Sequence, residues 1–367
     1  MIPKRFKNVF LSSIYQNAGK TTVALGLYKL FQERGLKTAF MKPVGQQVVN
    51  VKRRHIDKDS YLMGEVYHCY RKMVEMSPVT IGRGFTEKYI LNPQKRTLQK
   101  KIVEAYKKLI RGKDAIIIEG TGHAGVGSVI DFSNADVAKL LGSKVIIVSE
   151  GGIGKSIDEI ILNKALFDLK SVEILGVIVN KVLPEKYDKI KRIVGQGLKN
   201  KGIRLLGVIP MDALLKAPTV DQIKERLGLQ LLCGQENLSN KVLNNIVAAM
   251  EPHNMINYLK EGTLVLLSGD RVDNIMVAVS SHLITQKHNR LVSGIILTGG
   301  LLPNQKIVDM LKQSQVPVLL SPSDTYTVAA QVEHLICKIQ KTDKDKILEA
   351  RQVVKDHVDL NLILKNL

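Results

Sequence analysis

Short apolar runs alternate with segments of helical periodicity along the first part of this chain. The runs are rich in Val, Ile and Leu, and they predict strands over residues 9–11, 37–41, 115–118, 144–148, 174–179 and 205–209. Apolar residues at helical spacing predict helices over 98–110, 131–141 and 156–169. Strands that are apolar throughout are typical of a parallel sheet buried on both faces. Residues 1–222 therefore predict a doubly wound parallel α/β domain.

A second, smaller α/β pattern follows over residues 223–339. It predicts strands over 262–267, 294–297 and 316–320, and helices over 272–283, 304–312 and 324–339. Ser323 is the expected N-cap of the last of these helices. The final residues, 340–367, predict one or two charged helices that pack on this second domain.

The turn after the first strand has the composition of a phosphate-binding loop. Such a loop needs inward backbone N–H groups, a lysine for the outer phosphates and a hydroxyl for Mg²⁺. A helical pattern follows it, so a helix N-terminus would point at the phosphates. The strict pattern has Gly at position 14, where this chain has Ile14, and Gly-Lys-Thr by itself also occurs by chance. The predicted phosphate-binding residues are Asn17, Ala18, Gly19, Lys20, Thr21 and Thr22.

Other polar residues follow strands whose carboxyl ends would meet at this loop, where open α/β sheets bind ligands. Glu119 ends an apolar run, as expected for a carboxylate that meets Mg²⁺, and Asp59 is a second candidate carboxylate. Lys42 could neutralise charge on a phosphoryl group or on a substrate carboxylate. Asn180 could pair with a purine edge, and Leu183 replaces the Asp of a guanine reader, which favours adenine. The alternative for each is an exposed polar residue at a strand end.

Composition and charge narrow the class of protein. The 367 residues favour two domains, and no apolar run approaches the roughly 20 residues of a membrane helix. Three widely spaced cysteines indicate reduced thiols, so we expect a cytoplasmic protein with no membrane partner. The net charge of +20 is spread along the chain, with aromatic residues at 5%. We therefore expect no specific nucleic-acid partner.

Taken in order, these motifs resemble the dethiobiotin synthetase family of P-loop proteins. The resemblance is closer to the dethiobiotin-synthetase-like N-terminal region of long phosphotransacetylases, and it covers about the first 222 residues. Residues 223–339, with turns at Asp270-Arg271 and Thr298-Gly299-Gly300, resemble the DRTGG domain of the same proteins. The motifs that carry the first resemblance are Ser13 to Gly19-Lys20-Thr21, Lys42-Pro43-Val44, Asp59, Glu119-Gly120-x-Gly122, Asn180 and Gly207-Val208-Ile209-Pro210.

The resemblance implies roles for individual residues. Thr21, Asp59 and Glu119 would be Mg²⁺ ligands, Gly19, Lys20 and Thr22 would bind phosphate, and Asn180 and Pro210 would flank the adenine of ATP. Lys42 would lie at the reacting centre, so Lys42 and Lys20 are the candidate catalytic residues. The resemblance also implies a homodimer. Two residues depart from the family pattern, because Ser13 replaces a glycine and Gly122-His123 replaces paired glycines. The second change touches the loop beside the substrate and argues against the diamine substrate of the synthetase.

Two functions from different classes fit these observations. The first is an ATP-dependent ligase, synthetase or ATPase that activates a small carboxylate or carbamate. The second is a nucleotide-responsive regulatory or scaffold protein related to the non-catalytic N-terminal region of phosphotransacetylase. These 367 residues leave no third domain for acetyl transfer, so we expect no acetyltransferase activity from them. The two turns of the DRTGG-like domain could bind a nucleotide or acyl ligand, form a dimer surface, or be tight turns only.

Overall fold

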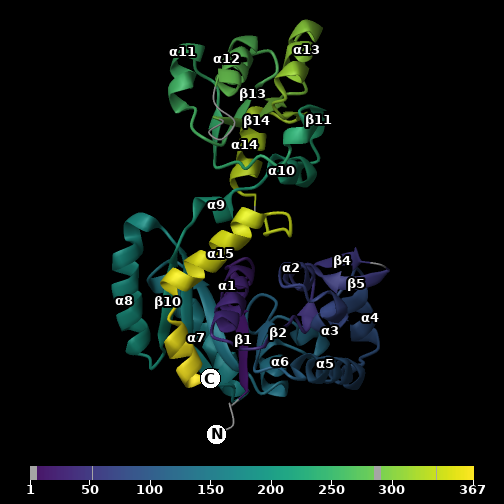
Figure 1. The fold of residues 1–367 in the computed structure, drawn as a ribbon, viewed down its shortest axis with the longest axis vertical. Helices are drawn as coiled ribbons and strands as arrows, with labels where there is room; N and C mark the ends of the chain where they lie inside the picture. The colour runs from purple at the N-terminus through teal and green to yellow at the C-terminus, as the bar shows by residue number, and fades with distance from the viewer. Residues whose placement is uncertain (1–5, 52, 285–290, 336) are drawn as a thin grey trace. The chain divides into compact units, whose positions relative to one another are not determined.

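The chain folds into two compact α/β units. The computed structural model describes residues 6–367 apart from 52, 285–290 and 336. The first unit comprises Met1–Met211 with Ile339–Leu367, and the second comprises Asp212–Lys338. Each unit has a mainly parallel sheet with helices packed around it (Figure 1). The predicted fold class, a parallel α/β P-loop domain followed by a smaller α/β domain, is confirmed.

The first unit contains a six-stranded sheet with the order β10-β9-β8-β1-β7-β2, in which all neighbours are parallel. Its strands are β1 (Lys7–Ser13), β2 (Thr38–Met41), β7 (Ala115–Glu119), β8 (Lys144–Glu150), β9 (Ile174–Val182) and β10 (Leu205–Pro210). Two small sheets pair β3 (Val44–Gly45) with β6 (Val79–Thr80) and β4 (Val48–Val51) with β5 (Arg54–Asp57). All six strands predicted for this domain are present.

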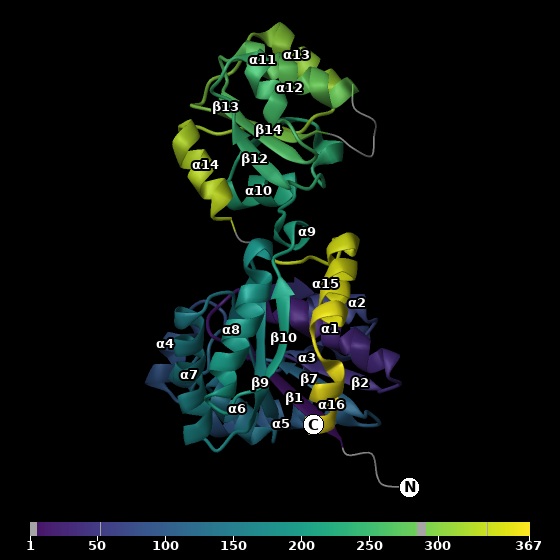
Figure 2. The same cartoon turned by 90° about the vertical axis from the view of Figure 1, so that its left-hand side faces the viewer.

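The helices of the first unit cover both faces of this sheet. They are α1 (Lys20–Glu33), α2 (Lys58–Val66), α3 (Met73–Met76), α4 (Phe85–Leu91), α5 (Lys95–Ile110), α6 (Asn134–Leu140), α7 (Gly154–Leu169), α8 (Tyr187–Lys199), α15 (Lys344–His357) and α16 (Leu360–Asn366). Figure 2 shows α1 and α15 on one side of the sheet and α7 and α8 on the other. This double layer explains why the strands carry apolar side chains on both faces.

One predicted helix is shorter than its periodicity suggested. The pattern over 131–141 predicted a single helix, but α6 begins at Asn134. Ser133 caps it, because its hydroxyl accepts the Asp136 N–H while the Asp136 side chain accepts the Ser133 N–H. This capping box fixes the start of the helix. Asp131, which precedes it, has a positive φ of 61° and ends a separate turn over Ser128–Ile130.

The C-terminal helices belong to the first unit. The expectation that residues 340–367 pack on the second domain is wrong, because α15 packs along α1 and α16 lies against β10. The contact is close at Gly26 of α1, where a Cβ atom would lie 2.2 Å from the Cβ of Val354. Val354 is fully buried. The charged and apolar residues of the segment predicted a helix, but they could not identify the surface that it covers.

Replacing Gly26 with alanine is expected to lower the free energy of unfolding by about 1–3 kcal/mol, because the added methyl group overpacks a filled contact. The opposite effect, about 1 kcal/mol, follows from helix propensity alone. Urea denaturation shows which of these two opposite effects on the free energy of unfolding is larger. The added variant Val354→Ala on the Gly26→Ala background is expected to recover part of the loss, since neighbouring sites couple. An increase in stability of Gly26→Ala would contradict the close packing of α1 and α15.

The second unit contains a five-stranded sheet with the order β11-β15-β14-β13-β12. Its strands are β11 (Gln230–Cys233), β12 (Asn244–Val247), β13 (Thr263–Ser268), β14 (Val292–Thr298) and β15 (Val318–Leu320), and only the β11–β15 pair is antiparallel. Its helices are α9 (Ala213–Lys216), α10 (Val220–Leu227), α11 (Pro252–Met255), α12 (Val272–Ile284), α13 (Gln305–Ser314) and α14 (Thr325–Glu333). Alternate residues of β13 enter two separate apolar clusters, so this sheet is also buried on both faces.

Two predictions for the second unit need correction. Asp324, not Ser323, caps α14, because its carboxylate accepts the Thr327 N–H at 2.9 Å. The helix ends at Glu333 rather than continuing to 339, and residue 336 of that prediction lies outside the described residues. Strands β11 and β12 were not predicted, because they are short and only partly buried.

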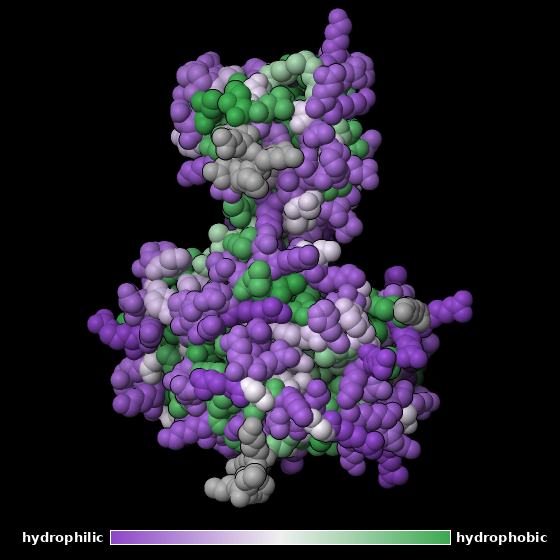
Figure 3. Space-filling model, viewed as in Figure 1, coloured by the Kyte–Doolittle hydropathy of each residue, from purple (hydrophilic) through white to green (hydrophobic). Residues whose placement is uncertain are grey.

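The face of the protein drawn in Figure 3 is mainly hydrophilic. Figure 3 shows hydrophilic side chains over most of the visible face of each unit. Among the residues that the structure describes, none of the helices combines the length and the apolar character that a bilayer crossing requires.

Candidate functional site

The P-loop lies between β1 and α1 and is shaped by a close approach at Gly19. Gly19 has a φ of 98°, and a Cβ atom there would lie 2.0 Å from Nδ2 of Asn180. That same Asn180 amide donates to the carbonyl oxygen of Ala18 at 2.9 Å. Asn17 also has a positive φ, of 63°. Asn180, which we predicted to contact a purine, is thus held against the backbone of the loop.

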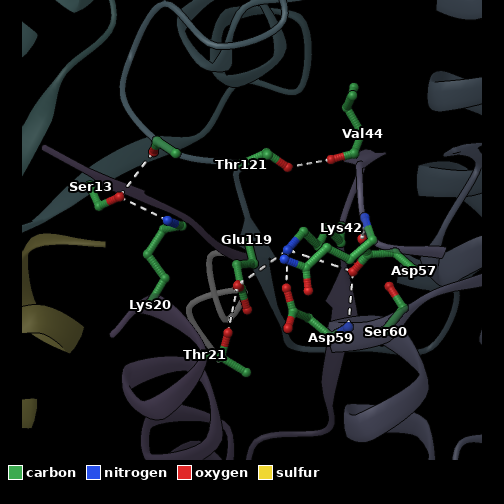
Figure 4. A network of polar contacts seen from close by, with 12 residues as sticks. Ser13, Lys20, Thr21, Lys42, Val44, Asp57, Asp59, Ser60, Glu119 and Thr121 are labelled. Carbon is green, nitrogen blue, oxygen red and sulfur yellow. Dashed lines mark hydrogen bonds and ion pairs between the residues drawn. The ribbon is translucent and has the colours of Figure 1, made fainter. Parts of the chain in front are cut away.

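The lysine of the P-loop, Lys20, is buried and contacts Ser13, which replaces a glycine of the family pattern. Lys20, 7% exposed, donates from Nζ to the Ser13 hydroxyl at 2.8 Å. Ser13 Oγ also lies 3.0 Å from the carbonyl oxygen of Gly122, as Figure 4 shows. The hydroxyl at position 13 therefore gives the ammonium group a polar partner inside the loop. A glycine there would offer no side-chain oxygen.

Thr21 and Glu119 meet at the end of the sheet. Thr21 Oγ1 donates to Glu119 Oε1 at 2.9 Å. Register explains the meeting, because Glu119 ends β7 directly opposite Leu11 of β1, two residues before that strand ends. The parallel pairing brings the carboxylate to the edge where α1 begins. Glu119 is 1% exposed.

Lys42 lies among three buried carboxylates (Figure 4). Its Nζ contacts Asp59 directly, and it lies 3.6 Å from Asp57 and 3.5 Å from Glu119. Lys42 itself is 4% exposed. Burial lowers its pKa, but the negative charges of Asp59, Glu119 and Asp57 outweigh that effect and hold the pKa above its ordinary value. The ammonium group is therefore charged at neutral pH.

Asp57 is a residue of this cluster that the sequence analysis did not select. It caps α2, because its carboxylate accepts the Asp59 N–H at 2.9 Å. A Cβ atom at Gly45 would lie 2.5 Å from the Asp57 side chain, so a small residue is needed there. An Asp two residues before the predicted ligand was a recognisable N-cap signal. Its proximity to Lys42 follows only from the fold.

Asn134 is a second missed residue, and it organises the glycine-rich loop after β7. The buried amide donates to the carbonyl oxygens of Thr121 at 2.9 Å and His123 at 2.6 Å, and it accepts the Thr121 N–H at 3.1 Å. Thr121 in turn donates to the carbonyl oxygen of Val44 at 2.6 Å. His123 accepts the Gly125 N–H within the loop. The sequence carried no signal that connected Asn134 with this loop.

A third missed group joins the P-loop to the ends of β8 and β9. Lys181 donates to the carbonyl oxygen of Asn17 and to Glu150, both at 2.6 Å. Tyr15 also donates to Glu150, at 2.5 Å. Burial and this hydrogen bond raise the pKa of Tyr15. The three side chains anchor the outer part of the loop from two strands.

The remaining predicted residues lie on the same edge. Thr22 is in the first turn of α1. Pro210 ends β10, where it pairs with Val182 of β9, two residues after Asn180. Asn180 and Pro210 therefore lie near the ends of two neighbouring strands.

The oxygen donors at this edge suit a magnesium ion. Mg²⁺ prefers oxygen ligands and is often bound through one or two carboxylates, phosphate oxygens and several waters. Glu119 and Thr21 touch, and Asp59 is linked to Glu119 through Lys42. In the part of the chain that the structure describes, no group of three or more His, Cys, Asp or Glu forms a metal site by itself. The predicted set has two carboxylates and a hydroxyl, so it would need ligands from a nucleotide and water.

The turns of the second unit are held by internal contacts. Arg271 donates to Asp273 and to the carbonyl oxygens of Ala249 and Met250, at 2.9–3.2 Å. The N–H groups of Gly299 and Gly300 donate to the carbonyl oxygens of Ser323 and Ser321. Both glycines have positive φ. These contacts support the interpretation of both sequences as tight turns that join neighbouring loops.

Comparison with known proteins agrees with this geometry. Residues 7–219 match the family model described as AAA domain, which is more than half of the chain. The chain belongs to this AAA domain family. Its P-loop AAA domain is followed by a DRTGG domain, matched over residues 222–335.

The relatives of this AAA domain protein include longer enzymes. It is 28% identical to phosphate acetyltransferase of Nitratidesulfovibrio vulgaris over 362 residues, which is 96% of this chain and 50% of that protein. It is 27% identical to phosphate acetyltransferase of Synechocystis over 369 residues, 98% of this chain and 52% of that protein. The chain thus spans about half the length of these curated relatives. The resemblance to long phosphotransacetylases is confirmed.

Among solved structures, the chain is similar to a ParA family ATPase from Chlorobium tepidum. The TM-score is 0.35 and the sequence identity is 17%, over 56% of this chain and 85% of that chain.

Proposed function

We propose that this chain binds ATP with Mg²⁺ at the P-loop of its first unit. The observation that carries the proposal is the convergence of Lys20, the Thr21–Glu119 pair and Lys42 at one sheet edge. Two buried lysines supply positive charge for the phosphates, and the oxygen donors beside them suit Mg²⁺. We propose that Asn180 and Pro210, from the neighbouring strands β9 and β10, flank the adenine ring.

The first candidate for the use of ATP is activation of a small carboxylate or carbamate. An oxygen of the acceptor would attack the γ-phosphorus, the bond to the bridging oxygen would break, and ADP would leave as an acyl phosphate forms. Lys42 would neutralise charge that develops on the transferred group, and Lys20 would hold the outer phosphates. Thr21, Asp59 and Glu119 would hold Mg²⁺, which would supply positive charge to offset the charge of the phosphates. Positioning and electrostatics are enough for this chemistry, so no further catalytic group is required.

The second candidate is a nucleotide-responsive regulatory protein. The relatives favour this candidate, because the chain aligns with about half the length of two phosphate acetyltransferases and contains a DRTGG domain. In this role Mg-ATP would be sensed rather than consumed, and the DRTGG domain would bind an effector or form the contact surface of a homodimer. The protein would then act in the cytoplasm on acyl-phosphate metabolism.

One experiment tests the proposal and separates its two candidates. ATP binding to the purified protein is measured by calorimetry with and without Mg²⁺, and phosphate release is then followed with a panel of small carboxylates and diamino acids. We expect Mg²⁺-dependent binding. Stimulated phosphate release by one acceptor establishes the enzyme and its substrate class. Binding without stimulation by any acceptor supports the regulatory role, and absence of binding rejects the proposal.

A further inference from the structure

Two of the three acidic residues around Lys42 take their positions from helix α2. Asp59 lies in the first turn of α2 and Asp57 is its N-cap. Both carboxylates are buried, so they cannot reorient by moving into solvent. Any displacement of α2 therefore displaces the carboxylate that we assign to Mg²⁺.

The outer side of α2 is held by α15 at two places. Lys341, just before α15, donates to the Tyr61 hydroxyl at 2.6 Å, lies 3.5 Å from Glu65 and stands 5.0 Å above the Tyr61 ring. At the C-cap of α2, Arg351 donates to the Tyr67 hydroxyl at 3.3 Å, with its guanidinium 5.0 Å above that ring. Cations above aromatic faces are attracted to the ring as well as to the hydroxyl.

Tyr67 joins these two helices to the helix of the P-loop. Its hydroxyl donates to the carbonyl oxygen of Leu25 in α1 at 2.6 Å, while it accepts from Arg351. Its ring lies 4.1 Å from the ring of Tyr28, centroid to centroid. Figures 1 and 2 both show α15 beside α1, with α2 next to them. The three helices thus meet around one partly buried tyrosine hydroxyl.

We propose that α15, through Lys341 and Arg351, positions α2 and thereby sets how strongly Mg²⁺ supports ATP binding. The inference rests on the proposed nucleotide site and deepens it, because it assigns a positioning role to two residues that cannot reach the nucleotide. The chain leaves the second unit at Lys338 and enters the first at Ile339, so Lys341 lies three residues beyond the second unit.

The test uses the full chain with Lys341→Ala, Arg351→Ala and the double variant. Affinity for a non-hydrolysable ATP analogue is measured by calorimetry in EDTA and at a series of Mg²⁺ concentrations. We expect affinity in EDTA to stay unchanged, because it depends on Lys20 and the loop backbone. The Mg²⁺ concentration for half-maximal tightening should rise about threefold to tenfold in the double variant. Arg351→Lys, which keeps the cation above Tyr67, should recover part of this change.

Lys355→Ala is the matched control, because Lys355 is an exposed lysine in the last turn of the same helix. It should leave both affinities unchanged. Equal Mg²⁺ dependence in the wild type and the double variant would overturn the inference. A parallel loss of affinity in EDTA and in Mg²⁺ would also overturn it, because such a loss indicates a general loss of structure. If the wild type does not bind the analogue at all, the proposed function fails first. Lys341→Ala changes an exposed side chain, so we expect this variant to fold. The test therefore remains valid with this single variant.

Discussion

ATP affinity is expected to fall about 30-fold to about 4,000-fold when Lys20 is replaced by alanine. Lys20 is the buried cation of the P-loop, and its ammonium group donates a hydrogen bond to the Ser13 hydroxyl. Removing one member of a buried, hydrogen-bonded charge pair costs about 2–5 kcal/mol, which corresponds to that range. Calorimetric titration with Mg-ATP measures the change directly.

Lys29→Ala provides the control for this variant. Lys29 lies on the same helix, is partly exposed and pairs with Glu33 four residues later, so its loss should alter ATP affinity by less than about twofold. A Lys20→Ala protein that binds Mg-ATP as tightly as the wild type would show that the nucleotide binds elsewhere. The assignment of residues 17–22 as the phosphate site would then be wrong.

Lys42→Met is expected to lower the free energy of unfolding by about 3–5 kcal/mol. The substitution removes the cation that Asp57, Asp59 and Glu119 share and leaves three buried carboxylates close together. Breaking a buried ion pair by deleting one partner costs about this much, because the remaining charge stays desolvated. Methionine keeps a similar length, so little of the loss comes from packing. Urea denaturation at neutral pH provides the measurement.

Magnesium supplies a second readout for the same variant. If Asp59 and Glu119 are metal ligands, Mg²⁺ should stabilise Lys42→Met more than the wild type, because the ion replaces part of the missing charge. Lys29→Met, an exposed change, should lose less than about 0.5 kcal/mol. A loss below about 1 kcal/mol for Lys42→Met would contradict a shared ion-pair cluster. Equal stabilisation of both proteins by Mg²⁺ would argue against these two ligands.

The strands of the first sheet were predictable because a strand buried on both faces has a distinctive composition. The β7 sequence Ala115–Ile118 is apolar at every position, and the sheet confirms it as a central strand. Short strands with half-exposed residues, such as β12 (Asn244–Val247), lack this signal and were missed. The start of α14 was misplaced by one residue, because Ser323 and Asp324 are both good N-caps and only the local geometry chooses between them.

The residues of the candidate site were predictable to the extent that each follows a strand. Lys20, Thr21 and Glu119 belong to motifs that are local in sequence, so their elements could be assigned without coordinates. Asp57, Asn134 and Lys181 were missed because their partners are distant in the chain. Lys181, for example, holds the carbonyl oxygen of Asn17, which is 164 residues away.

Local sequence was enough to identify the buried strands of the first sheet, the P-loop motif and the order of the AAA and DRTGG domains, because these features depend on residues close together in the chain. The folded chain was needed to find that three carboxylates surround Lys42, that Lys20 donates to Ser13, and that the C-terminal helix α15 packs on α1 rather than on the second unit. Those arrangements depend on sheet order, on register and on the close approach of α15 to α1 at Gly26. Long-range packing creates all three, and no local pattern records them.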